Sequence, residues 1–142
     1  FGGKLMSDMD DIASIAAAKH CRRMVVTASM DSVDFLMPIR TTDSVCLESF
    51  VTWTGNTSME VFVKVITENL MTSERNIAAT SFLTFVALDE HNRPVKVPKV
   101  IAETVEEKKL YETAVLRTRM RKQRRIESKQ FAEFLTTSFP WE

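Results

Sequence analysis

The sequence predicts an α+β fold in which one long helix covers one face of an antiparallel sheet. Apolar side chains recur at helical spacing over residues 3–20, and four stretches rich in β-branched and aromatic residues follow from residue 24 onward. Short polar segments separate these stretches, as is typical of antiparallel strands. An amphipathic helix next to such a sheet buries its apolar side against it, which gives the α+β arrangement.

The predicted helix covers residues 3–20. At about 100° per residue, its apolar side chains gather on one arc, while charged residues such as Lys4, Asp11 and Lys19 fall on the opposite side. The alanines at 16–18 have high helix propensity and allow close packing on a sheet. The residues expected to face the core are Leu5, Met9, Ile12, Ala13, Ala16 and His20, with Met6 and Ala17 beside them.

Four strands are expected after this helix. The third alternates most clearly, because Glu60 and Lys64 stand on the face opposite to a series of apolar residues. The segment Thr54-Gly55-Asn56-Thr57 is a turn signal, so the second and third strands should form a hairpin. The expected strand ranges are 24–37, 44–54, 59–68 and 76–89.

A second helical region follows Pro94 and Pro98. Thr104 and Glu107 match a capping box, which marks a helix start. We expect a helix from Val105 to about 125 and a shorter one over roughly 127–136. The sequence therefore divides into a domain at 1–100 and a basic C-terminal helical tail at 101–142.

The tail contains six positive charges in the nine residues from Arg117 to Arg125. Such a run can bind phosphates or anionic lipid, and it is also typical of a solvated helix face or a subunit contact. The whole chain has a formal net charge of zero, so the overall basic balance of a nucleic-acid binder is missing. No apolar run approaches the roughly 18 residues that a membrane span needs.

The two cysteines, Cys21 and Cys46, give neither a disulfide framework nor a metal-ligand spacing. This usage is typical of a reducing compartment, so we expect a cytoplasmic protein without a metal or a cofactor. P-loop, GxSxG and HExxH patterns are also missing from the sequence.

The strongest candidate for chemistry is the segment Phe1-Gly2-Gly3, which leads into the helix that carries Asp10. Two glycines leave the N–H groups of a helix start unobstructed, and those donors can stabilise the oxyanion formed when a carbonyl is attacked. Gly3 and Asp10 are seven residues apart and therefore share a helix face. Asp10 lies at the edge of the apolar arc, where partial desolvation suits a general base; a solvated helix position is the alternative.

Other polar residues are weaker candidates. His20 and Cys21 are adjacent, and adjacent residues rarely form a nucleophile–base pair, so we expect structural roles for both. His91 lies in a polar turn and is expected at the surface. Thr57 and Ser58 can offer hydroxyl groups to a ligand, although turn residues of this kind usually make local hydrogen bonds.

Residues 1–10 (FGGKLMSDMD) resemble the FGG-x-x-M-x-x-MD signature of the bacterial acyl-CoA hydrolases and of the related cytosolic brain-type acyl-CoA hydrolases. Three further segments agree in the same order, at 25–35, 55–60 and 79–87. The resemblance runs from Phe1 to about Val100, and the basic tail is also similar. Four matching segments in order are more specific than any single motif.

This resemblance implies the hotdog fold, in which a curved antiparallel sheet wraps around a long helix. It also implies homodimers in which the strand at about 24–37 pairs with its copy, and trimers of such dimers. Active sites in this family lie at the dimer interface, so we expect an isolated monomer to be inactive. The expected partners are acyl-CoA and further copies of the chain, and neither a nucleic-acid partner nor a membrane span is expected.

The resemblance also implies roles for single residues. Asp10 matches the family's catalytic aspartate, as general base or nucleophile, and Gly2 and Gly3 match the glycines whose backbone faces the thioester carbonyl. The family's upstream asparagine and its first strand are not in this sequence. Because the chain also lacks an initiator Met, we expect upstream residues to be missing from it.

The expected reaction is hydrolysis of fatty acyl-CoA to a free fatty acid and CoA. Competing hypotheses are a hotdog dehydratase, which needs a His–acid pair, and a non-catalytic acyl-CoA binder or regulator. A carboxylate beside two glycines favours the enzyme, since a binder has no need of it. The expected substrate-binding residues are Asn56, Thr57, Ser58, Arg93 and Lys96, with Arg22 or Arg23 as further candidates for the CoA phosphates.

Overall fold

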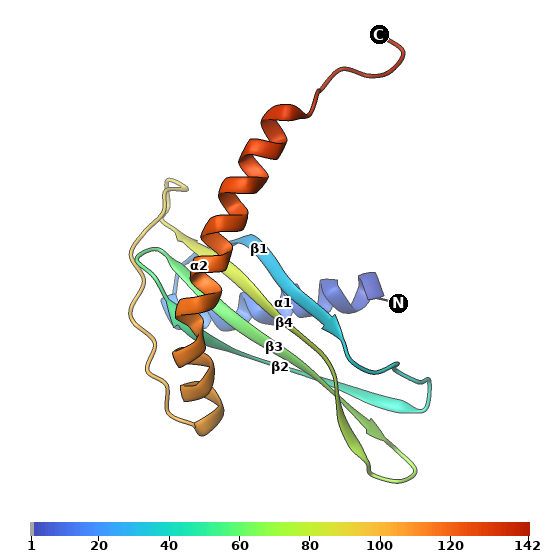
Figure 1. The fold of residues 1–142 in the computed structure, drawn as a ribbon. Coiled ribbons are helices and arrows are strands. Elements are labelled where there is room, and N and C mark those ends of the chain that lie inside the picture. The colour runs from blue at the N-terminus through green and yellow to red at the C-terminus, as the bar shows by residue number, and fades with distance from the viewer. Residues whose placement is uncertain (1) are drawn as a thin grey trace. The chain divides into compact units, whose positions relative to one another are not determined.

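The computed structural model describes residues 2–142, and its elements follow the order helix, four strands, helix (Figure 1). Phe1, the first residue of the Phe1-Gly2-Gly3 segment, lies outside the described residues. The chain forms two compact units, Phe1–Glu103 and Thr104–Glu142. None of the described helices is long and apolar enough to cross a membrane.

Helix α1 spans Gly2–Cys21 and begins one residue earlier than predicted. Its buried residues are Leu5, Met9, Ala13 and Ala17, which recur every four positions and so form one straight row. Ile12 and Ala16 pack at the border of this row. The predicted apolar face is therefore confirmed for these six residues, whereas His20 is only partly buried and Met6 is 37% exposed.

The sheet is antiparallel and has the strand order β1-β4-β3-β2, so β1 and β2 are its edges within the described chain. The β2–β3 hairpin predicted from the turn signal is confirmed. The first strand pairs with the last one rather than with its neighbour in sequence. The strands are β1 Met24–Phe35, β2 Asp43–Thr54, β3 Ser58–Asn69 and β4 Arg75–Leu88.

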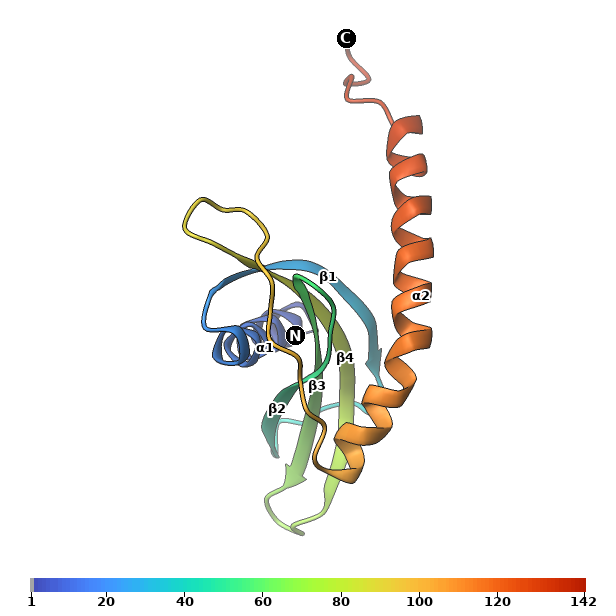
Figure 2. The ribbon, with the colours of Figure 1, turned by 90° about the vertical axis from the view of Figure 1, so that its left-hand side faces the viewer.

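The core lies between α1 and the concave side of the sheet. Figure 2 shows the strands curving around α1, and the helix contacts all four of them. Alternate residues of β3 and β4 face the helix and are fully buried, including Val61, Val63, Leu83 and Phe85. In β4 the burial alternates with the period of two expected for a strand with one face in the core. In β3 both faces are buried from Met59 to Val63, so Glu60, expected opposite to the apolar face, is also buried and accepts a hydrogen bond from Thr52. The predicted α+β class is confirmed.

Residues 89–103, here called the connector, run from the end of β4 along one end of the sheet. Backbone N–H groups of Val95 and Val97 donate to the carbonyl oxygens of Ala87 and Asn56, at 3.0 and 2.9 Å. Val97 is buried in the core. The connector is therefore held in place, although it has no helix or strand of its own.

The second unit consists of helix α2, Val105–Phe134, and a short C-terminal segment. The predicted capping box is present, since Thr104 accepts from the Glu107 backbone and the Glu107 side chain returns to the Thr104 backbone. The prediction of two helices in this region was wrong. Neither glycine nor proline occurs between Val105 and Phe134, so nothing in the sequence breaks the helix near residue 126.

Candidate active site

Asp10 is anchored by a residue from the sheet. The Thr27 hydroxyl donates a hydrogen bond to Asp10 Oδ1 over 2.8 Å. Asp10 lies in the middle of α1 and Thr27 lies near the start of β1, so the contact joins two elements across the edge of the core. The Asp10 side chain is neither buried nor fully exposed. One carboxylate oxygen is thus oriented by the protein.

Thr27 lies next to an irregularity in β1. Thr27 pairs with Phe85 of β4, but the register then shifts between Thr27 and Ser29, leaving Ala28 as an extra residue. A bulge of this kind bends a strand and redirects the neighbouring side chains. Bulges are common next to active sites and on edge strands, and β1 is an edge strand of this sheet.

Gly2 and Gly3 form the first turn of α1, where the helix itself supplies no acceptor for their N–H groups. A Cβ built on Gly2 would lie at an ordinary 3.7 Å from Phe35 Cζ. One built on Gly3 would meet nothing within 4 Å, in the part of the chain that the structure describes. Neither glycine has a positive φ. Packing within one copy therefore does not require glycine here, although glycine costs helix stability.

The two glycines and Asp10 are well separated along α1. Seven residues correspond to a rise of about 10 Å at ~1.5 Å per residue. A carbonyl bound by the Gly2 or Gly3 N–H groups therefore lies too far from the Asp10 carboxylate of the same copy for direct attack or for attack through one held water, which need contacts of roughly 3 Å.

The turn residues expected to bind substrate lie beside the connector. The carbonyl oxygen of Asn56 accepts from Val97 N at 2.9 Å, and that of Thr57 accepts from Ala87 N at 3.0 Å. Lys96 directly precedes Val97, so Lys96 and Asn56 are brought together, and both are exposed. Backbone pairing thus fixes this turn and leaves its side chains available.

Ser58 is separated from Asp10 by the sheet. Ser58 pairs with Val86, and Val86 pairs with Val26, whereas Thr27 and Phe85 belong to the next row. Because side chains alternate between faces, the Ser58 row points away from α1 while Thr27 points toward it. The structure therefore does not bring the Ser58 hydroxyl to Asp10 within one copy.

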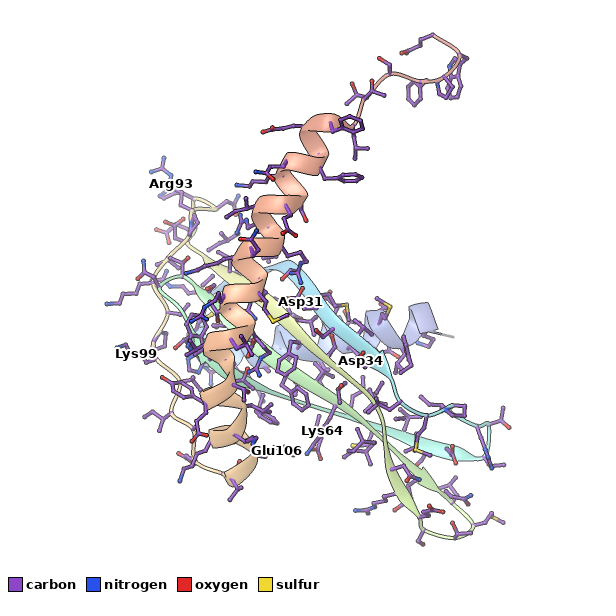
Figure 3. The ribbon with its side chains drawn as sticks, in the orientation of Figure 1. Asp31, Asp34, Lys64, Arg93, Lys99 and Glu106 are labelled. Atoms are coloured by element: carbon purple, nitrogen blue, oxygen red, sulfur yellow. The ribbon has the colours of Figure 1, made fainter. Side chains whose placement is uncertain are left out.

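The predicted cations lie around the end of α1 and the connector. His20 Nε2 lies 2.7 Å from the carbonyl oxygen of Pro98, which ties the last turn of α1 to the connector close to Lys96. Arg22 and Arg23 follow this turn and are exposed. Arg93 lies in the turn after β4 and points away from the sheet (Figure 3).

The His20 contact also bears on the dehydratase hypothesis. One ring nitrogen of His20 lies within hydrogen-bond distance of a backbone carbonyl, whereas a dehydratase site needs a histidine beside an acid.

Cys21 makes a local contact, since its Sγ lies 3.8 Å from the Arg23 carbonyl oxygen. Within residues 2–142, no group of three His, Cys, Asp or Glu side chains is arranged to hold a metal ion.

A model of the thioesterase superfamily matches residues 1–74. The chain belongs to this family. It is 66% identical over 141 residues to a Bacillus subtilis (strain 168) protein named uncharacterized acyl-CoA thioester hydrolase YkhA, covering 99% of this chain and 82% of the relative. It is 38% identical over 113 residues to the rat cytosolic acyl coenzyme A thioester hydrolase, covering 78% of this chain and 30% of the relative.

Solved structures agree. An acyl-CoA hydrolase from Staphylococcus aureus, in complex with butyryl coenzyme A, coenzyme A and coenzyme A disulfide, has a TM-score of 0.91 and 48% identity, covering 94% of this chain and 82% of that one. An apo-hexameric acyl-CoA thioesterase has a TM-score of 0.84 and 52% identity, covering 87% and 80%. The expected resemblance and the hotdog fold are confirmed.

Further structures of the S. aureus hydrolase have alanine in place of an aspartate, of a threonine and of an asparagine. Its replaced aspartate and threonine are seventeen positions apart, which is also the separation of Asp10 and Thr27. The asparagine precedes the aspartate in that chain.

Thr27 is the site residue that sequence reasoning missed. It occurs in a predicted strand, in one of the segments that carries the family resemblance, and a threonine in a strand is ordinary. Its proximity to Asp10 depends on how α1 lies across β1. The sequence offers no separate signal for Thr27, because the strand irregularity beside it is visible only in the structure.

Proposed function

We propose that this thioesterase-superfamily chain hydrolyses fatty acyl-CoA to a free fatty acid and CoA, with Asp10 as general base or nucleophile. The Thr27–Asp10 hydrogen bond is the observation that carries the proposal. The hydroxyl holds one carboxylate oxygen. The second oxygen is then left to take a proton from an attacking water, or to attack the thioester carbonyl itself. Its relatives named acyl-CoA hydrolases support the substrate class.

The N–H groups of Gly2 and Gly3 polarise the thioester carbonyl in this proposal. They have no acceptor within α1, they lie at its positive end, and they stabilise the oxyanion as the carbonyl is attacked. The sparse packing around both glycines supports this role: a Cβ would lie 3.7 Å from Phe35 at Gly2, and would meet none of the described residues within 4 Å at Gly3, so packing within one copy leaves room for a carbonyl.

The roughly 10 Å between these glycines and Asp10 favours a site shared by two copies. In such a site the glycines of one copy hold the carbonyl while Asp10 and Thr27 of the other copy supply the attack. The free edge of β1, which carries Thr27, is the surface on which the two copies pair. An isolated monomer is inactive on this proposal.

Positive and polar side chains near the connector bind the rest of the substrate. Arg93 and Lys96, with Arg22 or Arg23, are proposed for the CoA phosphates, since charge-assisted hydrogen bonds suit such groups. Asn56, Thr57 and Ser58 are proposed to contact substrate bound mainly by a partner copy, because Ser58 faces away from Asp10 of its own copy.

We also propose that the chain forms dimers through β1 and that these dimers assemble into a hexamer. A related acyl-CoA thioesterase is hexameric, which supports this number of copies. A cytoplasmic location is proposed with the cytosolic rat relative as support.

The first experiment measures thiol release from a panel of acyl-CoAs by wild type, Asp10→Asn and Asp11→Asn. Asp11 is an exposed neighbour on the same helix and serves as the matched control. We expect Asp10→Asn to lose at least about 100-fold in kcat, and Asp11→Asn to stay within about twofold, because only Asp10 acts on the reacting atoms. Acyl-CoA binding without hydrolysis by wild type would show a sensor instead of an enzyme.

A further inference from the structure

Helix α2 exposes large apolar side chains, and four of them share one side, whereas Val115 and Ile126 are exposed elsewhere on the helix. Ala114 is its one buried residue among those described, whereas Leu116, Met120, Phe131 and Phe134 are 58%, 63%, 64% and 86% exposed. These four residues, here called the apolar stripe, fall within about 60° of the helix circumference at ~100° per residue. Ala114 lies outside this arc.

The segment after α2 adds two more aromatic residues. Phe139 and Trp141 stack with ring centroids 4.8 Å apart and planes only 6° from parallel, and they are 55% and 79% exposed. Exposed apolar surface with several large side chains marks an interaction site, and tryptophan is enriched among the residues that dominate interfaces. Since Ala114 is the one buried residue of α2 among those described, packing within its own unit stabilises this helix little.

The charge of the two units indicates the kind of partner. Unit Thr104–Glu142 has nine Lys and Arg against six Asp and Glu, a net charge of +3. Unit Phe1–Glu103 has ten against thirteen, a net charge of −3. The tail of one copy is therefore electrostatically complementary to the first unit of another copy.

A membrane surface fits the stripe less well. Glu127 lies near the centre of the stripe, and its Oε1 accepts from Gln123 Nε2 at 3.1 Å. An interfacial helix buries its apolar face in the boundary between headgroups and acyl chains, where a central carboxylate is unfavourable. A protein–protein contact contains hydrogen bonds as well as apolar contacts, so it accommodates such a hydrogen-bonded pair.

If the hexamer proposed above is correct, its symmetry requires a second contact between copies, in addition to the pairing of β1. Edge-to-edge pairing of β1 is a two-fold contact and by itself ends at a dimer. A closed assembly of six identical copies therefore needs a second, different surface. We propose that the apolar stripe of α2, together with Phe139 and Trp141, is the surface that joins dimers, and that its partner is a second copy of this chain.

The test compares Phe131→Glu/Phe134→Glu with Leu70→Glu/Met71→Glu in the full chain. Leu70 and Met71 are similarly exposed, at 64% and 85%, but lie in the β3–β4 turn. Light scattering after size-exclusion chromatography should give six copies for wild type and for the turn variant. The stripe variant should fall about threefold in mass, to a dimer. Its thiol release should stay within about threefold of wild type, because β1 pairing is intact.

The proposal is overturned if the stripe variant keeps the wild-type mass, or if wild type itself is only a dimer. It is also overturned if wild type sediments with vesicles of 70% phosphatidylcholine and 30% phosphatidylglycerol, and only this binding is lost in the stripe variant.

If the Phe131→Glu/Phe134→Glu variant aggregates, the Leu116→Gln/Met120→Gln variant replaces it in the test. Amides of residues 126–134 should then exchange hydrogen slowly in wild type and much faster in the variant; equal exchange contradicts the contact. Loss of hydrolysis in Asp10→Asn leaves the mass unchanged, so the two proposals fail separately.

Discussion

Asp10 and Thr27 come from different elements, and the hydrogen bond between them distinguishes Asp10 from the other acidic residues of α1. Asp8 is 3.5 Å from Lys4 in a helical i,i+4 ion pair, and Asp11 is exposed. Exposed pairs of that kind contribute about 0–1 kcal/mol and orient a carboxylate weakly. The Thr27 hydroxyl, held by the backbone of a strand, gives Asp10 a fixed direction.

Replacing Thr27 by valine should slow hydrolysis while the protein stays folded. Valine keeps the shape and removes the donor to a charged acceptor, an interaction of about 1.5–3 kcal/mol, which corresponds to roughly 10- to 100-fold in kcat. Thr27→Ser keeps the hydroxyl and should recover most of the rate. A kcat for Thr27→Val equal to that of wild type, in steady-state thiol release, would remove Thr27 from the mechanism.

At the scale of elements, the turn between β2 and β3 differs from the start of α1 in what its glycine does. A Cβ on Gly55 would come within 2.9 Å of Ser58 Oγ and within 3.3 Å of the Trp53 ring. Gly3 has no such neighbour among the described residues. Packing therefore requires glycine at position 55 but not at position 3.

Gly55→Ala should lower the free energy of unfolding by about 1–3 kcal/mol, the usual cost of overpacking. Gly3→Ala should instead raise it by up to about 1 kcal/mol, because alanine is the better helix former. Urea unfolding of both variants measures the difference. Combining Gly55→Ala with Ser58→Ala removes the nearest atom, and a double variant as unstable as Gly55→Ala would show that the Trp53 ring is the obstacle.

Sheet order decides which elements can meet at the site. Because β1 pairs with β4 and not with β2, Thr27 lies on an edge strand and beside α1. The β2–β3 turn lies two strands away, at roughly 10 Å for strands ~4.8 Å apart. One copy therefore contributes the turn and the carboxylate to different regions of its surface.

At the scale of the whole molecule, a shared site predicts that two inactive variants restore activity when mixed. Asp10→Asn removes the carboxylate. Gly2→Pro removes one N–H at the first helical position, where proline is tolerated. In a mixed dimer, one site receives both defects and the other receives neither. Random mixing makes half of the dimers mixed, so we expect about a quarter of wild-type kcat after co-refolding equal amounts.

The control for this experiment is Gly2→Ala, which keeps the N–H group and should remain active by itself. If Asp10 and the glycines acted within one copy, every site of the mixture would carry one defect and the activity would stay near zero. That result would refute the shared site and would require a bend or shift of α1 to bring the groups together.

The sequence by itself determined the elements. Helical spacing located the apolar row of α1, alternation located the buried face of β3, and Gly55 with its neighbours located the hairpin, since each of these patterns is a local consequence of backbone geometry. The continuity of α2 was missed, although the lack of glycine and proline indicated it. Asp10 and the two glycines are proposed as site residues from one continuous segment, which also carries the family resemblance.

Only the tertiary structure decided what lies next to what. The pairing of β1 with β4, the contact between Thr27 and Asp10, and the separation of Ser58 from α1 all join residues that are distant in the chain. Such contacts depend on the register of strands and on how a helix crosses them. A one-residue change of register would reverse the face on which Thr27 lies, and no local pattern around residue 27 specifies that register.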